Sequence, residues 1–249
     1  MINRAREVLK EYYGYDSFRE RQEEIITSIL EGKDVVTIMP TGGGKSICYQ
    51  VPALILDGLT IVISPLISLM KDQVDNIKNM GIKSAYINST LSENEIKSIL
   101  NDVIKNEVKI LYVAPERLES TEFLNLITRV KISQIAVDEA HCISQWGHDF
   151  RSSYRRISKF IDLLVYRPII TAFTATATEE VRRDIINLLR LNEPKIFITG
   201  FDRKNLKITI EKAVVKKQYI LDYINSSEGA SGIIYCATRK DVDIIYEML

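Results

Sequence analysis

The chain has 249 residues, of which 46% are hydrophobic and 27% are charged, and its 33 basic residues balance its 33 acidic ones. This composition supplies a buried core and is ordinary for a soluble globular protein. No apolar run approaches the roughly 18 residues that a membrane span needs, and the first residues lack the apolar core of a secretion signal. We therefore expect a cytoplasmic protein. Zero net charge neither indicates nor excludes a nucleic-acid partner, because local clustering of charge matters more than the sum.

Short β-branched runs alternate with amphipathic helical patterns over the first 200 residues. Apolar strands separated by helices are typical of a parallel sheet that is covered on both faces. The predicted strands are Val35–Ile38, Thr60–Ile63, Ser84–Ile87, Lys109–Val113, Gln134–Val137 and Ile169–Phe173, and the clearest helices are Pro65–Asn79, Glu93–Lys105 and Thr178–Leu189. The predicted fold class is therefore α/β, a doubly wound parallel sheet.

The alternation breaks near residue 200, at Gly200-Phe201-Asp202-Arg203. Beyond it the sequence predicts strands at Lys207–Ile210 and Gly232–Cys236, with helices at about Lys216–Asn225 and from about Thr238. About forty residues are too few to bury a core of their own. We therefore expect one domain over residues 1–200, followed over 201–249 by a connecting segment and the incomplete start of a second domain.

A glycine-rich loop directly follows the first predicted strand. It reads Met39-Pro40-Thr41-Gly42-Gly43-Gly44-Lys45-Ser46 and opens a helix at about Lys45. Consecutive glycines let backbone N–H groups wrap around phosphate oxygens, and the helix N-terminus adds its positive end. Lys45 would reach the β- and γ-phosphates, and the Ser46 hydroxyl would ligate Mg²⁺. Met39 stands where the general pattern has glycine; the alternative interpretation is a plain turn between strand and helix.

An acidic pair, Asp138-Glu139, ends another apolar strand. In this arrangement Asp138 would hold Mg²⁺ and Glu139 would orient the attacking water, with Lys45 meeting the charge on the transferring phosphoryl group. Such a pair alone is common. Together with the upstream phosphate loop it predicts a site that hydrolyses ATP with Mg²⁺.

Aromatic and basic residues interleave just after the acidic pair. Trp146, Phe150 and Tyr154 lie among basic residues, and Arg151, Arg155 and Lys159 are four apart, which would place them on one helix face. Aromatic platforms beside cations are what single-stranded nucleic acid requires. The alternative is that the aromatic residues belong to the core and the cations to a solvated face.

The cysteines and histidines indicate no metal centre. Cys48, Cys142 and Cys236 lie far apart without a CxxC pair, so buried reduced thiols are expected and neither a zinc site nor a disulfide framework is indicated. His141 and His148 are the only histidines, too few for zinc. We expect His141 to be a hydrogen-bonding relay, and His148 to be either structural or part of the nucleic-acid site.

Several segments in the same order resemble RecQ DNA helicases, a group of superfamily 2 helicases. Asp138-Glu139-Ala140-His141 resembles their Walker B box, and Cys142–Arg151 resembles their aromatic-rich loop. Further resemblances are Tyr13–Gln22 to the nucleotide-recognition segment, Ser64–Gln73 to motif Ia, Ala114–Leu118 to motif Ib, Thr174–Ala177 to motif III, Phe201–Arg203 to the interlobe segment and Gly232–Cys236 to motif IV. The matches extend from about residue 13 to 239.

The resemblance implies two RecA-like lobes, residues 1–200 being the first and 201–249 the beginning of the second. It implies that Tyr15 stacks on adenine, that Gln22 reads the adenine edge and that Arg19 supports the site. Ser17-Phe18-Arg19-Glu20 also fits a helix-capping box, so Arg19 could be structural. Tyr15 could likewise be a packed surface aromatic.

The resemblance also implies that the aromatic loop, with Trp146, His148, Phe150 and Arg151, senses single-stranded DNA. His141 and motif III would couple hydrolysis to lobe movement. The family separates duplex and forked DNA in the 3′ to 5′ direction and serves DNA repair and recombination. Modest departures occur at Glu20-Arg21, Ser152 and Lys204.

The family's arginine finger, zinc-binding and winged-helix regions have no counterpart in this stretch, so independent unwinding by it is not expected. Two alternatives stay open: a module that binds nucleotide and DNA without turnover, and a superfamily 2 translocase on duplex DNA. The sequence leaves the oligomeric state open.

Overall fold

The computed structural model describes residues 1–200, 206–212, 215–227 and 229–249. The chain divides into two compact units, Met1–Phe201 and Asp202–Leu249, which are described separately below. None of the helices within the described ranges is long and apolar enough to cross a bilayer.

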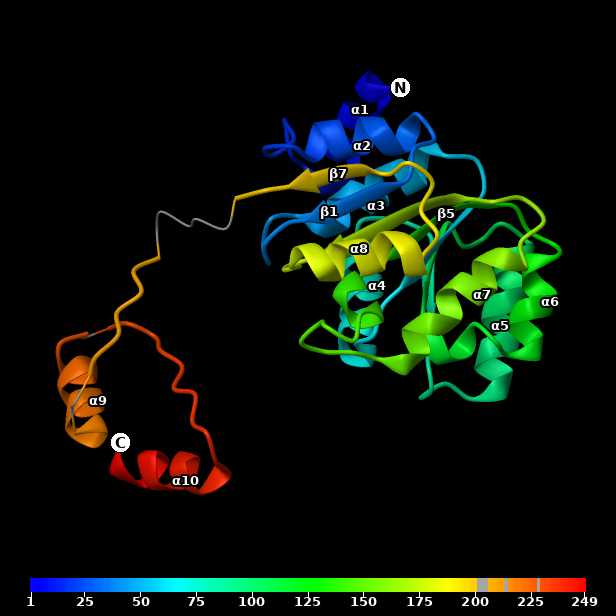
Figure 1. Ribbon diagram of the computed structural model, residues 1–249. Helices are drawn as coiled ribbons and strands as arrows, with labels where there is room; N and C mark the ends of the chain where they lie inside the picture. The colour runs from blue at the N-terminus through cyan, green and yellow to red at the C-terminus, as the bar shows by residue number, and fades with distance from the viewer. Residues whose placement is uncertain (201–205, 213–214, 228) are drawn as a thin grey trace. The chain divides into compact units, whose positions relative to one another are not determined.

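A seven-stranded, all-parallel sheet forms the centre of the first unit (Figure 1). Its spatial order is β3-β4-β2-β5-β6-β1-β7. The strands are β1 (Val35–Ile38), β2 (Leu59–Ile63), β3 (Ser84–Ile87), β4 (Ile110–Val113), β5 (Ile132–Val137), β6 (Ile169–Thr174) and β7 (Lys195–Ile198). The β-branched runs form strands because their side chains are buried on both faces of the sheet. The six predicted strands are confirmed to within two residues at each end.

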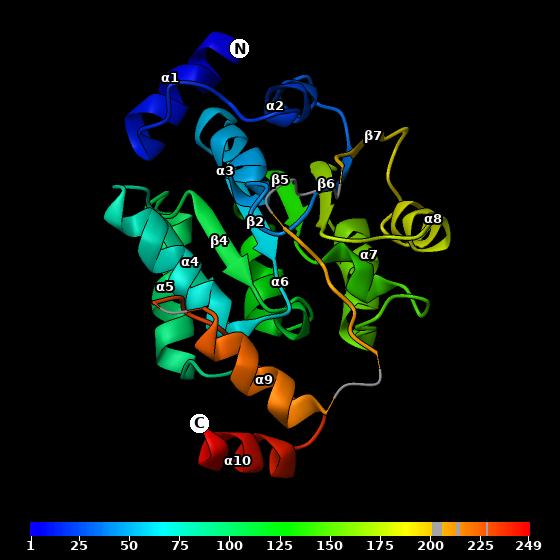
Figure 2. The same cartoon turned by 90° about the vertical axis from the view of Figure 1, so that its left-hand side faces the viewer.

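Helices cover both faces of this sheet, as the predicted fold class requires (Figure 2). One face packs on α2 (Gln22–Leu30), α3 (Lys45–Ile55) and α4 (Ile67–Asn79), with α1 (Ile2–Tyr13) lying on α2 and α3. The other face packs on α5 (Glu93–Ile104), α6 (Thr121–Ile127), α7 (Arg156–Asp162) and α8 (Glu179–Leu188). Three short 3₁₀ helices complete the unit: η1 (Pro115–Arg117), η2 (Ala140–Ile143) and η3 (Ser152–Arg155).

Three neighbouring strands end at one edge of the sheet and position the predicted site. The register pairs Ile38 of β1 with Thr174 of β6, and Val137 of β5 with Ala172 of β6. The glycine-rich loop leaves β1 and the acidic pair leaves β5. Because β6 lies between these two strands, both segments emerge beside the end of β6. In open α/β sheets this carboxyl edge is where ligands bind.

The second unit departs from the sequence prediction. Its helices α9 (Lys216–Asn225) and α10 (Arg239–Met248) lie where helices were predicted, but neither contains a buried residue. The predicted strands Lys207–Ile210 and Gly232–Cys236 are wrong, because neither segment pairs with another strand among the described residues. The interlobe segment Phe201–Arg203 lies outside the described residues. That these units are a first lobe and the start of a second stays a prediction.

Candidate functional site

The loop after β1 makes the tight turn that its glycines predict. Gly42 and Gly44 have φ angles of 79° and 86°, a left-handed conformation that glycine adopts without strain. A Cβ on Gly43 would lie 2.5 Å from Cγ of Met39, so a larger residue there would displace this core side chain. Helix α3 begins directly after Gly44 without a side-chain cap. The positive end of the helix therefore faces the loop.

Met39 and Lys45 close the two ends of this loop. Met39, at the position where the general pattern has glycine, is 2% exposed and packs in the core. Its N–H donates to the carbonyl oxygen of Thr174 at 3.0 Å, which ties the start of the loop to the end of β6. Lys45 Nζ donates to the carbonyl oxygen of Met39 at 3.0 Å. The lysine side chain therefore spans the loop from its last residues to its first.

The segment upstream of α2 is attached to the same loop. The Gln22 side chain is 1% exposed; its carbonyl oxygen accepts from the N–H of Arg19 at 2.8 Å, and its Nε2 donates to the carbonyl oxygen of Gly44 at 3.2 Å. Arg19 Nη1 donates to the carbonyl oxygen of Gly42 at 2.8 Å. Both residues are thereby brought to the phosphate loop. Tyr15 is 49% exposed, on the chain just before this segment.

The predicted capping box at Ser17–Glu20 is wrong. Helix α2 begins at Gln22, and its N-cap is Arg21 in a left-handed conformation without a side-chain hydrogen bond. Instead, the side-chain carbonyl oxygen of Gln22 accepts from the backbone N–H of Arg19. This hydrogen bond satisfies the N–H of Arg19 just ahead of the helix.

The acidic pair presents two carboxyl groups with opposite pKa shifts. Burial and, next to it, the negative charge of Glu139 raise the pKa of Asp138 to about 6. The pKa of Glu139 is lowered, chiefly by its hydrogen bond with His141. The positive charge of Lys45 acts on both carboxyl groups in the direction that favours ionisation. The loop and the acidic pair, far apart in sequence, therefore share one electrostatic environment.

Glu139 has a strained backbone. Its φ of 45° and ψ of 46° lie in the left-handed region, which costs a residue with a Cβ about 1 kcal/mol. Its N–H donates to Oδ1 of Asp138 at 3.0 Å, and the Tyr154 hydroxyl donates to the carbonyl oxygen of Asp138 at 2.8 Å. Strain of this kind persists where the surroundings hold it, and it concentrates at functional sites.

His141 links the acidic pair to the end of β6. Its Nδ1 lies 2.9 Å from Oγ1 of Thr174 and 3.3 Å from a carboxylate oxygen of Glu139. The Thr174 hydroxyl donates to the carbonyl oxygen of Thr176 at 3.0 Å, so its oxygen accepts from His141 and the proton lies on Nδ1. The His141 ring stacks on His148, with ring centres 4.1 Å apart. His148 thus belongs to the same cluster.

The aromatic loop, residues 142–151, exposes its apolar side chains. Trp146 is 76% exposed and Phe150 is 37% exposed, so the alternative in which they are core residues is wrong. The guanidinium of Arg155 lies 5.4 Å from the centre of the Phe150 ring, within the range of a cation–π contact.

Backbone and side-chain contacts hold this loop against the acidic pair. A Cβ on Gly147 would lie 2.4 Å from the carbonyl oxygen of His141, so only glycine fits without a shift. Arg151 Nη1 donates to the carbonyl oxygen of Pro65 at 2.8 Å, and Ser144 Oγ donates to Asp184 at 2.6 Å. The loop therefore contacts the start of motif Ia and helix α8 as well as η2.

Two details of the predicted aromatic and basic cluster are wrong. Tyr154 is fully buried rather than a platform, because its ring packs in the core and its hydroxyl bonds to the backbone of Asp138. Arg151, Arg155 and Lys159 do not share one helix face. Arg151 is extended and Arg155 ends a 3₁₀ helix, whose three residues per turn break the four-residue spacing.

The cysteines bear out the expectation only in part. Cys48 and Cys142 are buried and reduced, whereas Cys236 is half-buried. Among the described residues no group of three or more His, Cys, Asp or Glu side chains is arranged to hold a metal ion.

The donor set at the edge of the sheet nonetheless fits Mg²⁺. Ser46 and Asp138 offer a hydroxyl and a carboxylate, the hard oxygen ligands that Mg²⁺ takes alongside water and substrate phosphates. A Cβ at Gly43 or Gly44 would lie 2.5 Å from Met39 Cγ or 2.3 Å from Gln22 Nε2, so glycine keeps the loop tight. The residues present therefore suit a nucleotide phosphate with its metal.

Sequence reasoning missed a buried polar cluster beneath the loop. Tyr49 and Gln50 of α3 and Tyr112 of β4 are 0%, 2% and 1% exposed, and their side chains bond to one another. Aromatic residues in apolar runs are ordinarily core, so no signal in the sequence distinguished them.

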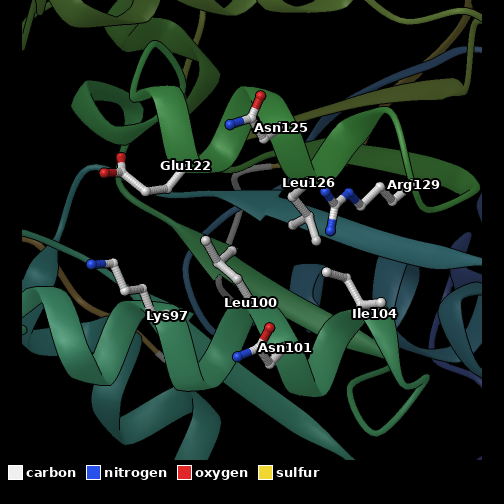
Figure 3. Close-up of a pocket in the computed structure, with 8 residues that line it drawn as sticks. All are labelled: Lys97, Leu100, Asn101, Ile104, Glu122, Asn125, Leu126 and Arg129. Atoms are coloured by element: carbon white, nitrogen blue, oxygen red, sulfur yellow. The ribbon is translucent and has the colours of Figure 1, made fainter.

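A groove of about 350 Å³ between α5 and α6 contains none of the predicted site residues. Leu100 and Leu126 face one another across it, with Lys97 and Glu122 towards one end and Arg129 towards the other (Figure 3). It lies apart from the carboxyl edge that carries the loop and the acidic pair.

Comparison with known proteins shows the family to which this chain belongs. The model of the DEAD/DEAH box helicase family matches residues 19–184. The chain is 49% identical over its whole length to the ATP-dependent DNA helicase RecQ of Bacillus subtilis, and 46% identical over 98% of its length to that of Pasteurella multocida. It spans 42% and 39% of these two relatives.

The fold is also found among solved structures. A hypothetical ATP-dependent RNA helicase from Sulfolobus tokodaii matches with a TM-score of 0.63 at 22% identity, over 100% of this chain and 72% of that one. This likeness confirms the RecA-like α/β fold. The family model and the sequence relatives together confirm the resemblance: the chain belongs to the DEAD/DEAH box helicase family and is of the RecQ type.

Proposed function

We propose that this chain binds ATP with Mg²⁺ and hydrolyses it in response to single-stranded DNA. The observation that carries the proposal is the meeting of the glycine loop and the acidic pair at one edge of the sheet, where the charge of Lys45 acts on Asp138 and on Glu139. This is the arrangement of groups that phosphoryl transfer requires.

Each residue of the phosphate site has a proposed role. The loop from Thr41 to Gly44 would cradle the phosphates, and Lys45 would leave the Met39 carbonyl for the β- and γ-phosphates. Ser46 and Asp138 would ligate Mg²⁺, which neutralises phosphate charge when bound. Glu139 is held in its ionised form by His141, so it can accept a proton from the attacking water.

The nucleobase would lie beside the segment ahead of α2. Tyr15 is exposed and would stack on adenine, while Arg19 supports the loop through the Gly42 carbonyl. Gln22 would read the adenine edge through the second lone pair of its amide oxygen, because Oε1 accepts from Arg19 and Nε2 already donates to the carbonyl oxygens of Gly43 and Gly44.

Single-stranded DNA would lie on the aromatic loop. Trp146 and Phe150 are exposed enough to stack on bases, and Arg151 and His148 would approach the sugar–phosphate backbone of the DNA. His141, which contacts Glu139, Thr174 and His148, would transmit DNA binding to the hydrolytic site and on to motif III.

Two of the relatives are named ATP-dependent DNA helicases, which supports the proposal, and the chain spans about two fifths of each. We propose that the whole protein unwinds duplex and forked DNA in the 3′ to 5′ direction, in the cytoplasm, in DNA repair and recombination.

Calorimetric titration of the 249-residue chain with ATP and Mg²⁺ tests the proposal. Lys45→Ala should abolish binding, whereas Lys78→Ala, which removes an exposed lysine of α4, should leave it unchanged. Equal binding by wild type and Lys45→Ala would contradict the proposed phosphate site. Binding without hydrolysis, with and without single-stranded DNA, would favour a module that does not turn over.

A further inference from the structure

The hydroxyl of Ser144 joins the aromatic loop to helix α8. Its Oγ donates to Oδ2 of Asp184 at 2.6 Å, a length typical of a bond from a hydroxyl to a carboxylate. The backbone N–H of Trp146 donates to the same Oγ at 3.1 Å. A carboxylate only accepts and a backbone N–H only donates, so the direction of both hydrogen bonds is fixed. The fully buried hydroxyl thus links the backbone of Trp146 to α8.

Trp146 lies in a tight turn that runs from Ser144 to Gly147. The N–H of Gly147 donates to the carbonyl oxygen of Ser144 at 3.1 Å, which closes the turn. The N–H of Ser144 donates to the carbonyl oxygen of His141 at 3.2 Å, which ties the turn to η2. Serine side chains commonly hold such turns by bonding to the backbone two residues on. The indole of Trp146 is 76% exposed, so its direction depends on the backbone of this turn rather than on packing around the ring.

Packing and charge on α8 do not explain why residue 184 is an aspartate. Val181 and Ile185 bury the apolar side of the helix in the same core cluster as η2, whereas Asp184 is half-buried. Among the described residues Asp184 forms no ion pair, and Glu180, one turn before it, carries a like charge. Aspartate in a helix interior and like charges four residues apart both weaken a helix. The bond from Ser144 accounts for a carboxylate at this position.

Helix α8 begins directly after motif III. Strand β6 ends at Thr174, and the side chain of Thr178 caps α8. Just ahead of the aromatic loop, His141 bonds to Thr174. Within the loop, Ser144 bonds to Asp184, which lies further along the same stretch of chain. The aromatic loop and the segment that carries motif III are therefore joined on both sides of the Thr178 cap.

We propose that Asp184 is a positioning residue for Trp146, acting through the hydroxyl of Ser144; the inference rests on the proposed binding of single-stranded DNA by the aromatic loop. By accepting from Ser144, the carboxylate fixes the serine rotamer that receives the N–H of Trp146. The indole is thereby held in one orientation before DNA binds, so stacking does not first have to order the turn. Helix α8 thus sets the direction of the base platform.

Intrinsic fluorescence tests this role, because Trp146 is the only tryptophan in the chain and is reported alone. Without DNA, its anisotropy should fall to the same level in Asp184→Ala and Ser144→Ala. The double variant should fall no further, because both substitutions break one link. Asp184→Asn keeps an oxygen that accepts from Ser144 and should restore most of the anisotropy. The matched control is Glu180→Ala, which removes the same charge from an exposed position on α8 and should behave as wild type.

Binding of a fluorescein-labelled single strand to the 249-residue chain provides the second measurement. Affinity should fall about tenfold in Asp184→Ala and Ser144→Ala, the factor expected for one hydrogen bond to a charged group, and should fall less in Asp184→Asn. Equal Trp146 anisotropy in wild type and Asp184→Ala would overturn the proposal, as would unaltered DNA affinity in a variant whose anisotropy has fallen. Failure of the wild type to bind the strand would instead refute the proposed function, while the anisotropy without DNA would still test the link to α8.

Discussion

Asp138→Asn is expected to increase the free energy of unfolding at neutral pH while it removes a metal ligand. Burial and the charge of Glu139 raise the pKa of Asp138 from 3.8 to about 6 in the folded protein. At neutral pH its ionised carboxylate is therefore less favourable in the folded than in the unfolded state. A difference of about two between the two pKa values corresponds to ~3 kcal/mol.

The dependence on pH follows from the sign of this shift. Below about pH 3 the carboxyl group is largely protonated in both states, so it costs the folded state little. The cost grows as the pH rises from about 4 to 6 and is complete above the folded-state pKa. The asparagine oxygen can still accept the bond from the N–H of Glu139, so this contact survives the substitution.

Urea denaturation at pH 7.5 and pH 4, without nucleotide, measures the effect. Asp138→Asn should be more stable than wild type by ~2–3 kcal/mol at pH 7.5, and by less than about 1 kcal/mol at pH 4. Asp75→Asn, on the exposed side of α4, makes the same change in charge and should leave stability nearly unchanged. An Asp138→Asn protein no more stable than wild type at pH 7.5, or equally stabilised at both pH values, would refute the reasoning.

Three further substitutions test the aromatic loop and its link to the acidic pair. Trp146→Ala should weaken binding of single-stranded DNA tenfold or more, since stacking contributes ~1–3 kcal/mol per base, and should leave ATP affinity unchanged. Fluorescence anisotropy measures the DNA affinity; an unaltered affinity would contradict DNA binding by the aromatic loop. Gly147→Ala should lower the melting temperature by several degrees and remove DNA stimulation of hydrolysis, because its Cβ would meet the His141 carbonyl oxygen at 2.4 Å. Normal stimulation in this variant would show that the loop shifts to accept the Cβ without losing its link to the acidic pair. His141→Ala removes the main cause of the low pKa of Glu139, so the acidic limb of the pH–rate profile for ATP hydrolysis should move to higher pH. An unmoved limb would contradict the control of the Glu139 pKa by His141.

The sequence was sufficient to predict the sheet and the residues at its carboxyl edge. Buried β-branched runs predict parallel strands, because a strand buried on both faces is apolar throughout and shows no alternation of apolar and polar residues. The glycine loop and the acidic pair are local patterns, so their placement followed once their strands were known. Strand β7 was missed because Ile196 and Ile198 are exposed at the edge, and four residues after a proline give little pattern.

Features that depend on tertiary contacts could not be predicted. The strands expected at Lys207–Ile210 and Gly232–Cys236 have strand-like composition, but a strand also needs a neighbour. Burial of Tyr154 and the polar cluster of Tyr49 and Tyr112 arise from segments that only the fold brings together. The stacking of His141 on His148 depends in the same way on the path of the loop between them.

Steady-state ATP hydrolysis by the chain, with and without single-stranded DNA, tests the central claim most directly when wild type is compared with Glu139→Gln. We predict that DNA stimulates hydrolysis by wild type. We also predict that the variant binds ATP with Mg²⁺ but does not hydrolyse it, with or without DNA. Equal hydrolysis by wild type and Glu139→Gln would contradict the assignment of Glu139, and with it the account of the site at the carboxyl edge of the sheet.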